Sequence, residues 1–183
     1  YQEFMEGKDI TVNITELEQP DVPLWAIWAL QQYAKETSKE ECLKKYGKFI
    51  KSVMLFIEGN HHPNLELHPN GLLYADGKNK AVTWMNSTAN GKPVVPRSGY
   101  IVEFNALWYN ALCFCAALCE LDGKQDRQQH LLELAEKTKQ SFLDTFLNEY
   151  GYLYDYVDGN MIDWSVRPNM IFPVAFDYSP LSQ

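Results

Sequence analysis

Two long polar segments carry the side chains whose types could do chemistry. They span residues 60–102 and 150–166, and the second leads directly into Arg167 and Asn169. The acids, amides, cations and tryptophans in or beside them are Asp76, Trp84, Asn86, Arg97, Glu103, Asp155, Asp163, Trp164, Arg167 and Asn169. Hydrolysis of a glycosidic bond needs a carboxylic acid that protonates the leaving oxygen and a carboxylate that activates water or attacks the sugar. The set is therefore typical of a carbohydrate site, although each acid taken singly is also typical of a solvated loop or a helix cap.

Aromatic residues are frequent in the chain, and most of the Trp and Tyr residues fall outside the regular helical runs. They make up 14% of all residues, with 5 Trp and 11 Tyr. Flat rings stack on the C–H faces of sugars, while sugar hydroxyls take directional hydrogen bonds. This composition favours sugar binding, with filling of the core and of hairpins as the alternative use of the same rings.

The net charge argues against several classes of partner. The chain carries a formal charge of −8, and its Lys and Arg residues are scattered among acids. Such a surface repels polyanions, so we expect neither nucleic acid nor an anionic membrane as a partner. A neutral substrate fits this balance better.

The cysteines and histidines do not form a pattern typical of a metal site. The cysteines are Cys42, Cys113, Cys115 and Cys119, and three of them share one apolar helical stretch, which is typical of buried thiols. His61 and His62 are adjacent in a polar loop without a third ligand, so we expect no metal and no cofactor. No signal peptide opens the chain and no apolar run approaches the length of a membrane span, which predicts a cytoplasmic protein.

Capping signals and apolar periodicity predict helices around the polar segments. Ser38 and Glu41 form an S-x-x-E capping box, and Gly59 stops the helix that follows. The predicted helices span residues 21–38, 38–59, about 103–121 and about 126–149. A fifth begins at Pro168, a residue typical of a first helical turn. Residues 65–74 predict a small β-hairpin that turns at a Pro-Asn-Gly sequence.

The two polar segments are related to one another. Residues 71–74 (GLLY) reach Trp84 after 84 − 71 = 13 residues, and residues 151–154 (GYLY) reach Trp164 after 164 − 151 = 13. Each copy follows a pair of predicted helices, and the copies lie 151 − 71 = 80 residues apart. The chain therefore repeats a unit of helix, helix and decorated loop.

A repeated helical hairpin with its long loop at the same end predicts a toroid whose loops gather over one mouth. We therefore predict an all-α fold, an incomplete toroid built from helical hairpins with small β-hairpins in the long loops. About two and a half units are present, and residues 179–182 are typical of the start of a further helix. We expect residues 1–183 to form a single segment, a fragment of a larger domain.

Five sequence blocks resemble those of glycogen debranching enzymes, in the same order. They are DVPLW at 21–25, TWMN at 83–86, KPVVPRSG at 92–99, VEFNALWYNAL at 102–112 and RPNMIF at 167–172. The resemblance implies an amylo-α-1,6-glucosidase domain with a six-hairpin (α/α)6 toroid. Such a domain removes the glucose branch stub of limit-digested glycogen by inverting hydrolysis, without a metal. The partners implied are the α-glucan and the remaining part of the parent chain.

The resemblance also bears on the catalytic residues. The general acid of the family is an Asp directly after Thr-Trp-Met, where this chain has Asn86. Because an amide cannot donate an acidic proton, another acid such as Glu103 or Asp163 serves, or the activity is lost or altered. The family's base lies in a C-terminal part that this chain does not reach, so we expect the isolated segment to be inactive. A non-catalytic α-glucan-binding module is the alternative function.

Further residues are placed at the substrate end by the same resemblance and by the loop repeat. The candidates for substrate binding are Asp21, Trp25, Trp84, Arg97, Asn105, Trp164, Arg167 and Asn169. Trp84 could stack on a sugar face, while Arg97 and Asn105, with Glu103, could hold hydroxyls. The alternative for Arg97 and Glu103 is an ion pair that braces the loop against the third helix. A repeat scaffold that binds protein is a third function, although such scaffolds usually keep their loops short.

Overall fold

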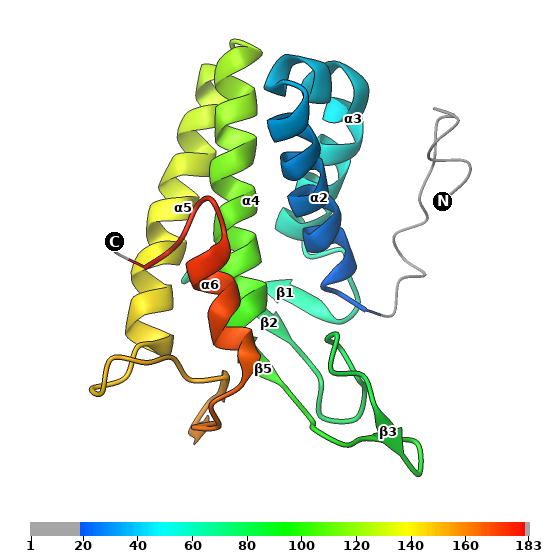
Figure 1. Ribbon diagram of the computed structural model, residues 1–183, viewed down its shortest axis with the longest axis vertical. Helices are drawn as coiled ribbons and strands as arrows, with labels where there is room; N and C mark the ends of the chain where they lie inside the picture. Colours follow the sequence, from blue (N-terminus) through cyan, green and yellow to red (C-terminus); the bar gives the residue numbers. More distant parts are fainter. Residues whose placement is uncertain (1–18, 182–183) are drawn as a thin grey trace.

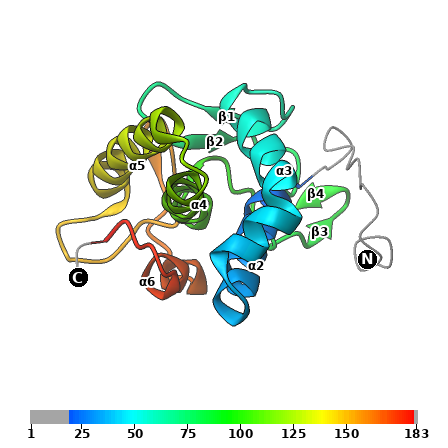
Figure 2. The same ribbon diagram turned by 90° about the horizontal axis from the view of Figure 1, so that it is seen from above.

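The computed structural model of the protein describes residues 19–181, which form a bundle of helices that stand side by side (Figure 1). The helices are α2 (Val22–Glu36), α3 (Lys39–Glu58), α4 (Val102–Leu121), α5 (Gln125–Phe146), the 3-10 helix η2 (Pro168–Ile171) and α6 (Phe172–Ala175). Seen from above, α4 lies in the middle, with α5 on one side and α2 and α3 on the other (Figure 2). Its buried side chains, among them Phe104, Trp108 and Phe114, form the centre of the core.

The capping signals predicted for α3 are present in the structure. The Ser38 hydroxyl accepts a hydrogen bond from the Glu41 backbone N–H at 3.1 Å, as the capping box predicts, and Gly59 follows the last residue of α3. The fifth predicted helix is shorter than expected, since Pro168 opens one 3-10 turn followed by the four residues of α6. Residues 179–181 are not helical, and Ser182 lies outside the described residues.

Helix α4 is the one described element that is long and apolar enough to cross a membrane by length and composition. The expectation that no apolar run approaches this length is therefore wrong. However, 78% of its most apolar window is buried inside the protein, against α2, α3, α5 and α6. The core helix of a globular domain has the same properties, so this helix is weak evidence for a membrane span.

A five-stranded sheet lies at the lower end of the bundle in Figure 1. Its strands are β1 (Leu65–Leu67), β2 (Leu73–Ala75), β5 (Gly99–Ile101), β6 (Tyr156–Asp158) and β7 (Met161–Ile162). They pair in the order β1-β2-β5-β6-β7, and every pairing is antiparallel. A separate two-stranded ribbon joins β3 (Thr88–Ala89) to β4 (Lys92–Pro93).

This sheet overturns the predicted fold class. The protein is about 52% helical with 12% strand, so the prediction of an all-α, incomplete (α/α)6 toroid is wrong. The reason is physical, because strands of two or three residues are too short to show an alternation of apolar and polar side chains. The hairpin predicted within residues 65–74 is confirmed, since β1 pairs with β2, but β2 also pairs with β5, which lies further along the chain.

The predicted repeat is visible in the hydrogen bonds of two equivalent turns. In the first, the His68 N–H donates to the Leu72 carbonyl and the Gly71 N–H donates to the His68 carbonyl. In the second, Asn148 takes the place of His68 and bonds in the same way to Tyr152 and Gly151. The turns lie 148 − 68 = 80 residues apart, and both glycines have positive φ, +86° and +79°. Both therefore adopt a conformation that glycine adopts readily and other residues rarely do.

The two decorated loops lie at the same end of the bundle, as predicted. Strand β5, from the end of the first loop, pairs with β6 of the second, with Tyr100 opposite Val157. The same Tyr100 stands opposite Tyr74 of β2. The sheet thus joins two loops that are far apart along the chain. It brings predicted site residues from both loops close together.

Candidate functional site

A buried cluster of charges lies where the two loops meet the first turn of α4. The Arg97 side chain donates from Nε and Nη2 to the two carboxylate oxygens of Asp155, at 2.8 and 2.9 Å. Its Nη1 and Nη2 also donate to the two oxygens of Glu103, the second at 2.6 Å. All three side chains are at most 1% exposed. One guanidinium therefore holds two buried carboxylates, each through two hydrogen bonds.

Three elements fix the members of this cluster. Glu103 is the second residue of α4, where a carboxylate is favoured by the helix N-terminus. Arg97 precedes β5 and Asp155 precedes β6, and these strands pair directly. The Val102 N–H also donates to the Asp155 carbonyl at 3.1 Å, so the backbone of the second loop is held against the start of α4.

Asp155 connects this cluster to the C-terminal block. Its carboxylate accepts a hydrogen bond from Arg167 Nη1 at 2.7 Å and another from Asn169 Nδ2 at 2.7 Å, in addition to those from Arg97. Asp155 was expected near the site but was given no role there. The sequence repeat could have indicated that Asp155 is buried. Asp155 occupies the position of the buried Ala75 in the first copy, because 155 − 80 = 75.

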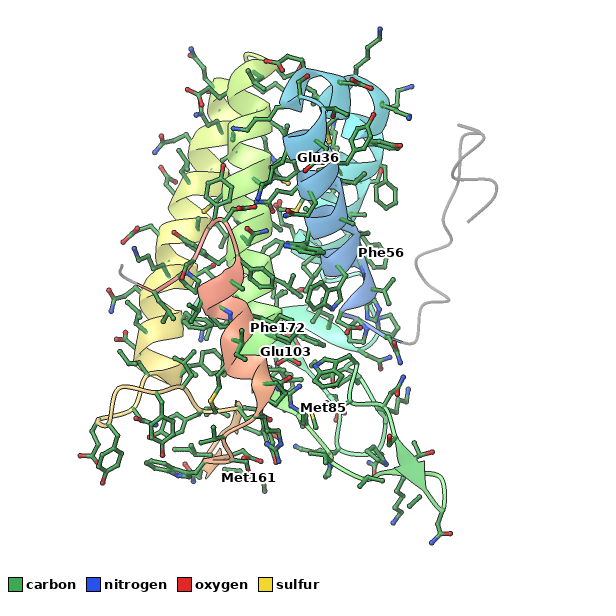
Figure 3. The ribbon with its side chains drawn as sticks, in the orientation of Figure 1. Glu36, Phe56, Met85, Glu103, Met161 and Phe172 are labelled. Atoms are coloured by element: carbon green, nitrogen blue, oxygen red, sulfur yellow. The ribbon has the colours of Figure 1, made fainter. Side chains whose placement is uncertain are left out.

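Asn169 is hydrogen-bonded both to Asp155 of the buried cluster and to the half-exposed indole of Trp84. Its Oδ1 accepts from Trp84 Nε1 at 2.9 Å, and its Nδ2 lies 3.5 Å from the Met85 sulfur. The Trp84 side chain is held by its edge while 47% of the residue stays accessible. In Figure 3, Met85 and Glu103 lie around the lower end of α4, whereas Glu36 lies at the opposite end of the bundle. An oriented, accessible indole is suited to stack on a sugar ring.

Asp21 is a buried carboxyl close to the backbone of Trp84. Only 3% of the residue is exposed, and its Oδ1 has no hydrogen-bond partner. Burial raises the pKa of the Asp21 carboxyl, although hydrogen bonding by the Trp25 side chain and the Trp84 backbone favours the ionised form. Trp25 itself packs edge-on against Phe172 of α6 at 5.3 Å between ring centroids. Asp21 thus has one buried carboxyl oxygen without a partner, close to the backbone of the residue that carries the exposed ring.

The match to known families agrees with this geometry. The family model described as amylo-alpha-1,6-glucosidase matches residues 13–183. The chain belongs to the amylo-α-1,6-glucosidase family. It is thus a glycosidase domain related to glycogen debranching enzymes, and the resemblance seen in the sequence is confirmed. No curated protein matches the chain.

Within this amylo-α-1,6-glucosidase domain, the structure brings most of the predicted site residues into one network. Arg97, Glu103, Arg167, Asn169 and Trp84 are joined through Asp155 by hydrogen bonds. Asp21 and Trp25 adjoin the network at Trp84.

The three candidate catalytic residues, Asn86, Glu103 and Asp163, differ in their ability to donate a proton. Asn86 is exposed and its amide makes no hydrogen bond to any described residue, so it can bind a hydroxyl but cannot act as an acid. Burial raises the pKa of the Glu103 carboxyl, with Arg97 opposing the rise, but both Glu103 oxygens are already bonded to Arg97. Neither oxygen is free to reach a glycosidic bond.

Asp163 is held as a hydrogen-bond acceptor. Its Oδ1 accepts from the Ser165 N–H at 2.7 Å and lies 3.1 Å from Arg167 Nη1. Burial acts to raise the pKa of Asp163, but these contacts outweigh it and lower the pKa below its usual value. The carboxyl is therefore ionised at neutral pH and is a poor proton donor.

Asn105 has a role in the sheet. Its Oδ1 accepts from the Leu73 N–H at 2.7 Å, and its Nδ2 donates to the carbonyls of Leu73 and Ile101 at 3.1 and 3.0 Å. The side chain is fully buried, so its amide pairs with β2 in the way that a neighbouring strand would. This geometry favours a bracing role and leaves no donor or acceptor directed at substrate.

One sizeable cavity does not coincide with this chemistry. A cavity of about 760 Å³ lies between α3, α4 and α5, lined by side chains such as Leu43, Met54 and Leu118. No predicted site residue and no aromatic ring lines it. Because sugar recognition needs stacking rings and convergent polar groups, we assign the candidate site to the loop end.

Proposed function

We propose that this domain binds the α-1,6-linked glucose stub of glycogen-type α-glucan and takes part in its hydrolysis with inversion, without a metal. The observation that supports this most is the accessible Trp84 ring, held by Asn169 and the buried Arg97 cluster, with the buried Asp21 carboxyl close to the Trp84 backbone. An oriented indole for stacking, with polar groups nearby for hydroxyls, is typical of a site for a glucosyl residue.

In inverting hydrolysis the bond between the anomeric carbon and the branch oxygen breaks. The acid gives its proton to that oxygen, and a water activated by the base adds to the opposite face of the sugar. Among the described carboxyls near Trp84, Asp21 combines a raised pKa with an oxygen that has no partner. We therefore propose Asp21 as the proton donor in place of the family's Asp, with its buried Oδ1 becoming accessible when substrate binds and the exposed Asn86 amide as a hydroxyl ligand.

Glucose release from a branched limit dextrin by the full-length protein that contains this domain tests this assignment, because the segment alone is expected to be inactive. Asp21→Asn should abolish release while dextrin binding persists, because the amide keeps the shape of the side chain and removes its acidic proton. Asn86→Asp should raise the rate, because it restores the family's acid position. If Asp21→Asn leaves the rate unchanged, the proton comes from elsewhere and the assignment is wrong.

A non-catalytic α-glucan-binding module is the second candidate, and Asn86 is the observation that favours it. In this case the protein binds the dextrin with the same Trp84 surface but releases no glucose. Calorimetric titration of the full-length protein that contains this domain with limit dextrin, followed by an assay for free glucose, separates the two. Trp84→Ala should weaken binding under either proposal, whereas Leu132→Ala, an exposed change on α5, should have no effect.

A further inference from the structure

The second loop carries an aromatic cluster that the proposed hydrolysis does not use. It consists of Tyr150, Tyr152, Tyr154 and Trp164, called here the aromatic platform. The Trp164 ring meets the Tyr154 ring edge-on at 4.6 Å between centroids and lies 6.4 and 6.5 Å from the rings of Tyr150 and Tyr152. Tyr150 and Tyr152 are nearly parallel to each other, with an interplanar angle of 20°.

Two of the four rings of the platform are exposed, and Tyr152 and Tyr154 are half-buried. Tyr150 is 70% exposed and Trp164 is 46% exposed. Burying such rings is favourable, and monomeric proteins rarely leave a contiguous aromatic patch uncovered without a use for it. The exposed rings make the platform a candidate binding surface, and its geometry and charge have to indicate the ligand.

Polar turns hold the platform in place before any ligand arrives. Asn148 Oδ1 accepts from the backbone N–H groups of Tyr150 and Tyr152, at 2.9 and 3.3 Å. On the other side, Asp163 accepts from the Ser165 N–H and from Arg167 and so fixes the chain around Trp164. Pre-ordered rings lose little conformational entropy on binding.

The shape of the platform suits a curved, uncharged chain of sugars. The ring planes of Tyr150 and Trp164 are inclined by 59°, so the two rings form an angled surface. Successive units of an α-1,4-linked glucan are turned relative to one another, and two inclined rings can each stack on one unit. The neighbouring Glu149, which is exposed, adds negative charge, which disfavours an anionic ligand.

The platform is also continuous with the candidate site. Tyr154, which contacts Trp164, directly precedes Asp155, and Asp155 connects through Asn169 to Trp84. A glucan chain on the platform thus lies close to the indole proposed to hold the branch stub.

We propose that the aromatic platform is a second α-glucan site, which binds α-1,4-linked glucosyl units of the chain that carries the branch stub. This rests on the proposed function for its substrate class, but it uses different residues and makes a different demand on the ligand. The platform requires a run of linear α-1,4-linked units and no α-1,6 bond.

Titration of the 183-residue chain with maltoheptaose, a linear α-1,4 glucan, tests the proposal. The readouts are calorimetry and the chemical shift of the Trp164 indole N–H. Trp164→Ala and Tyr150→Ala should each weaken binding about ten-fold, the equivalent of ~1.4 kcal/mol. Trp164→Phe keeps a ring face and should keep most of the affinity, and Leu132→Ala should bind as the wild type does. Because both platform residues are largely exposed, thermal unfolding should be little changed in these variants.

The outcomes separate this proposal from the proposed function. If Trp164→Ala weakens maltoheptaose binding and Trp84→Ala does not, the result supports the platform as a glucan site that is independent of the Trp84 site. If maltoheptaose binds equally well to wild type and Trp164→Ala, or to neither, the platform proposal is wrong, whatever the glucose-release assay shows. Self-association that is lost in Trp164→Ala, with glucan binding unchanged, would also overturn it and would indicate a protein-contact surface instead.

Discussion

Removal of the Arg97 guanidinium is the most direct test of the buried charge cluster. In Arg97→Leu, both oxygens of Glu103 lose their partners, whereas Asp155 keeps Arg167 and Asn169. Loss of one partner from a buried ion pair typically costs about 3–5 kcal/mol, because the other charge stays desolvated and unpaired. For a domain of this size each kcal/mol lowers the Tm by about 2–4 °C, so the expected fall is about 6–20 °C.

The double variant Arg97→Leu/Glu103→Leu distinguishes an unpaired charge from lost packing. With both charges removed, Glu103 no longer needs a partner, so the double variant should be more stable than Arg97→Leu. Urea unfolding followed by far-ultraviolet circular dichroism measures all the variants. Arg97→Lys, which keeps a charge but loses the planar fork, serves as the milder change if Arg97→Leu does not fold.

The pH dependence gives a second check on the same reasoning. Without Arg97, burial should hold the pKa of Glu103 above its unfolded value, so the penalty is largest well above that pKa. It should shrink as the pH falls through the raised pKa of the folded state and disappear below about 4.3, the unfolded value of a glutamate, because both states are then protonated. A loss of stability in Arg97→Leu that is the same at pH 7 and pH 4, or a double variant that loses the sum of the single losses, would refute this account.

Three further changes test the parts of the structure that hold the loops. Gly99→Ala should lower stability by about 1–3 kcal/mol in thermal unfolding, because φ is +93° and the new Cβ would lie 2.3 Å from the Val157 carbonyl oxygen; an unchanged Tm would contradict the close approach of β5 and β6. Asn105→Leu should cost about 1–3 kcal/mol in urea unfolding, because the N–H and C=O of Leu73 lose their partner, and no loss would mean that this strand edge is hydrated. Asp163→Asn should flatten the rise of stability with pH: the pKa of Asp163 is lowered in the folded state, so its contribution is present above about pH 4 and is lost as the pH falls further. Equal slopes for wild type and variant would show that Asp163 does not contribute.

The helices could be predicted from the sequence because their signals are local. The capping box at Ser38 and the stop at Gly59 gave the bounds of α3 to within a residue. The sheet could not be predicted in the same way, since its strands span two or three residues and its central pairing joins Tyr100 to Val157. Pairing over such a distance leaves no periodic trace in either strand. The repeat was the one signal that indicated the two loops belong together.

The sequence predicted which residues lie in the site better than it predicted the role of each residue. Motif blocks placed Arg97, Glu103 and Trp84 near one another, and the hydrogen bonds join them. The residue type alone could not show that both carboxylate oxygens of Glu103 are hydrogen-bonded to the Arg97 guanidinium. A glutamate in a sequence gives no indication of whether its oxygens are free or bonded. It also could not show that Asp155 is the centre of the network, since only the folded strands bring it to Arg97.

The long separation of the paired strands has a kinetic consequence. Tyr100 and Val157 are 157 − 100 = 57 residues apart, and closing so large a loop is slow and entropically costly unless the intervening helices have already formed. We therefore expect α4 and α5 to dock first and the sheet to assemble last. On the ribosome, Trp84 would emerge long before Asn169, its anchor, is synthesised. The surface proposed to recognise sugar would thus be the final part of this domain to mature.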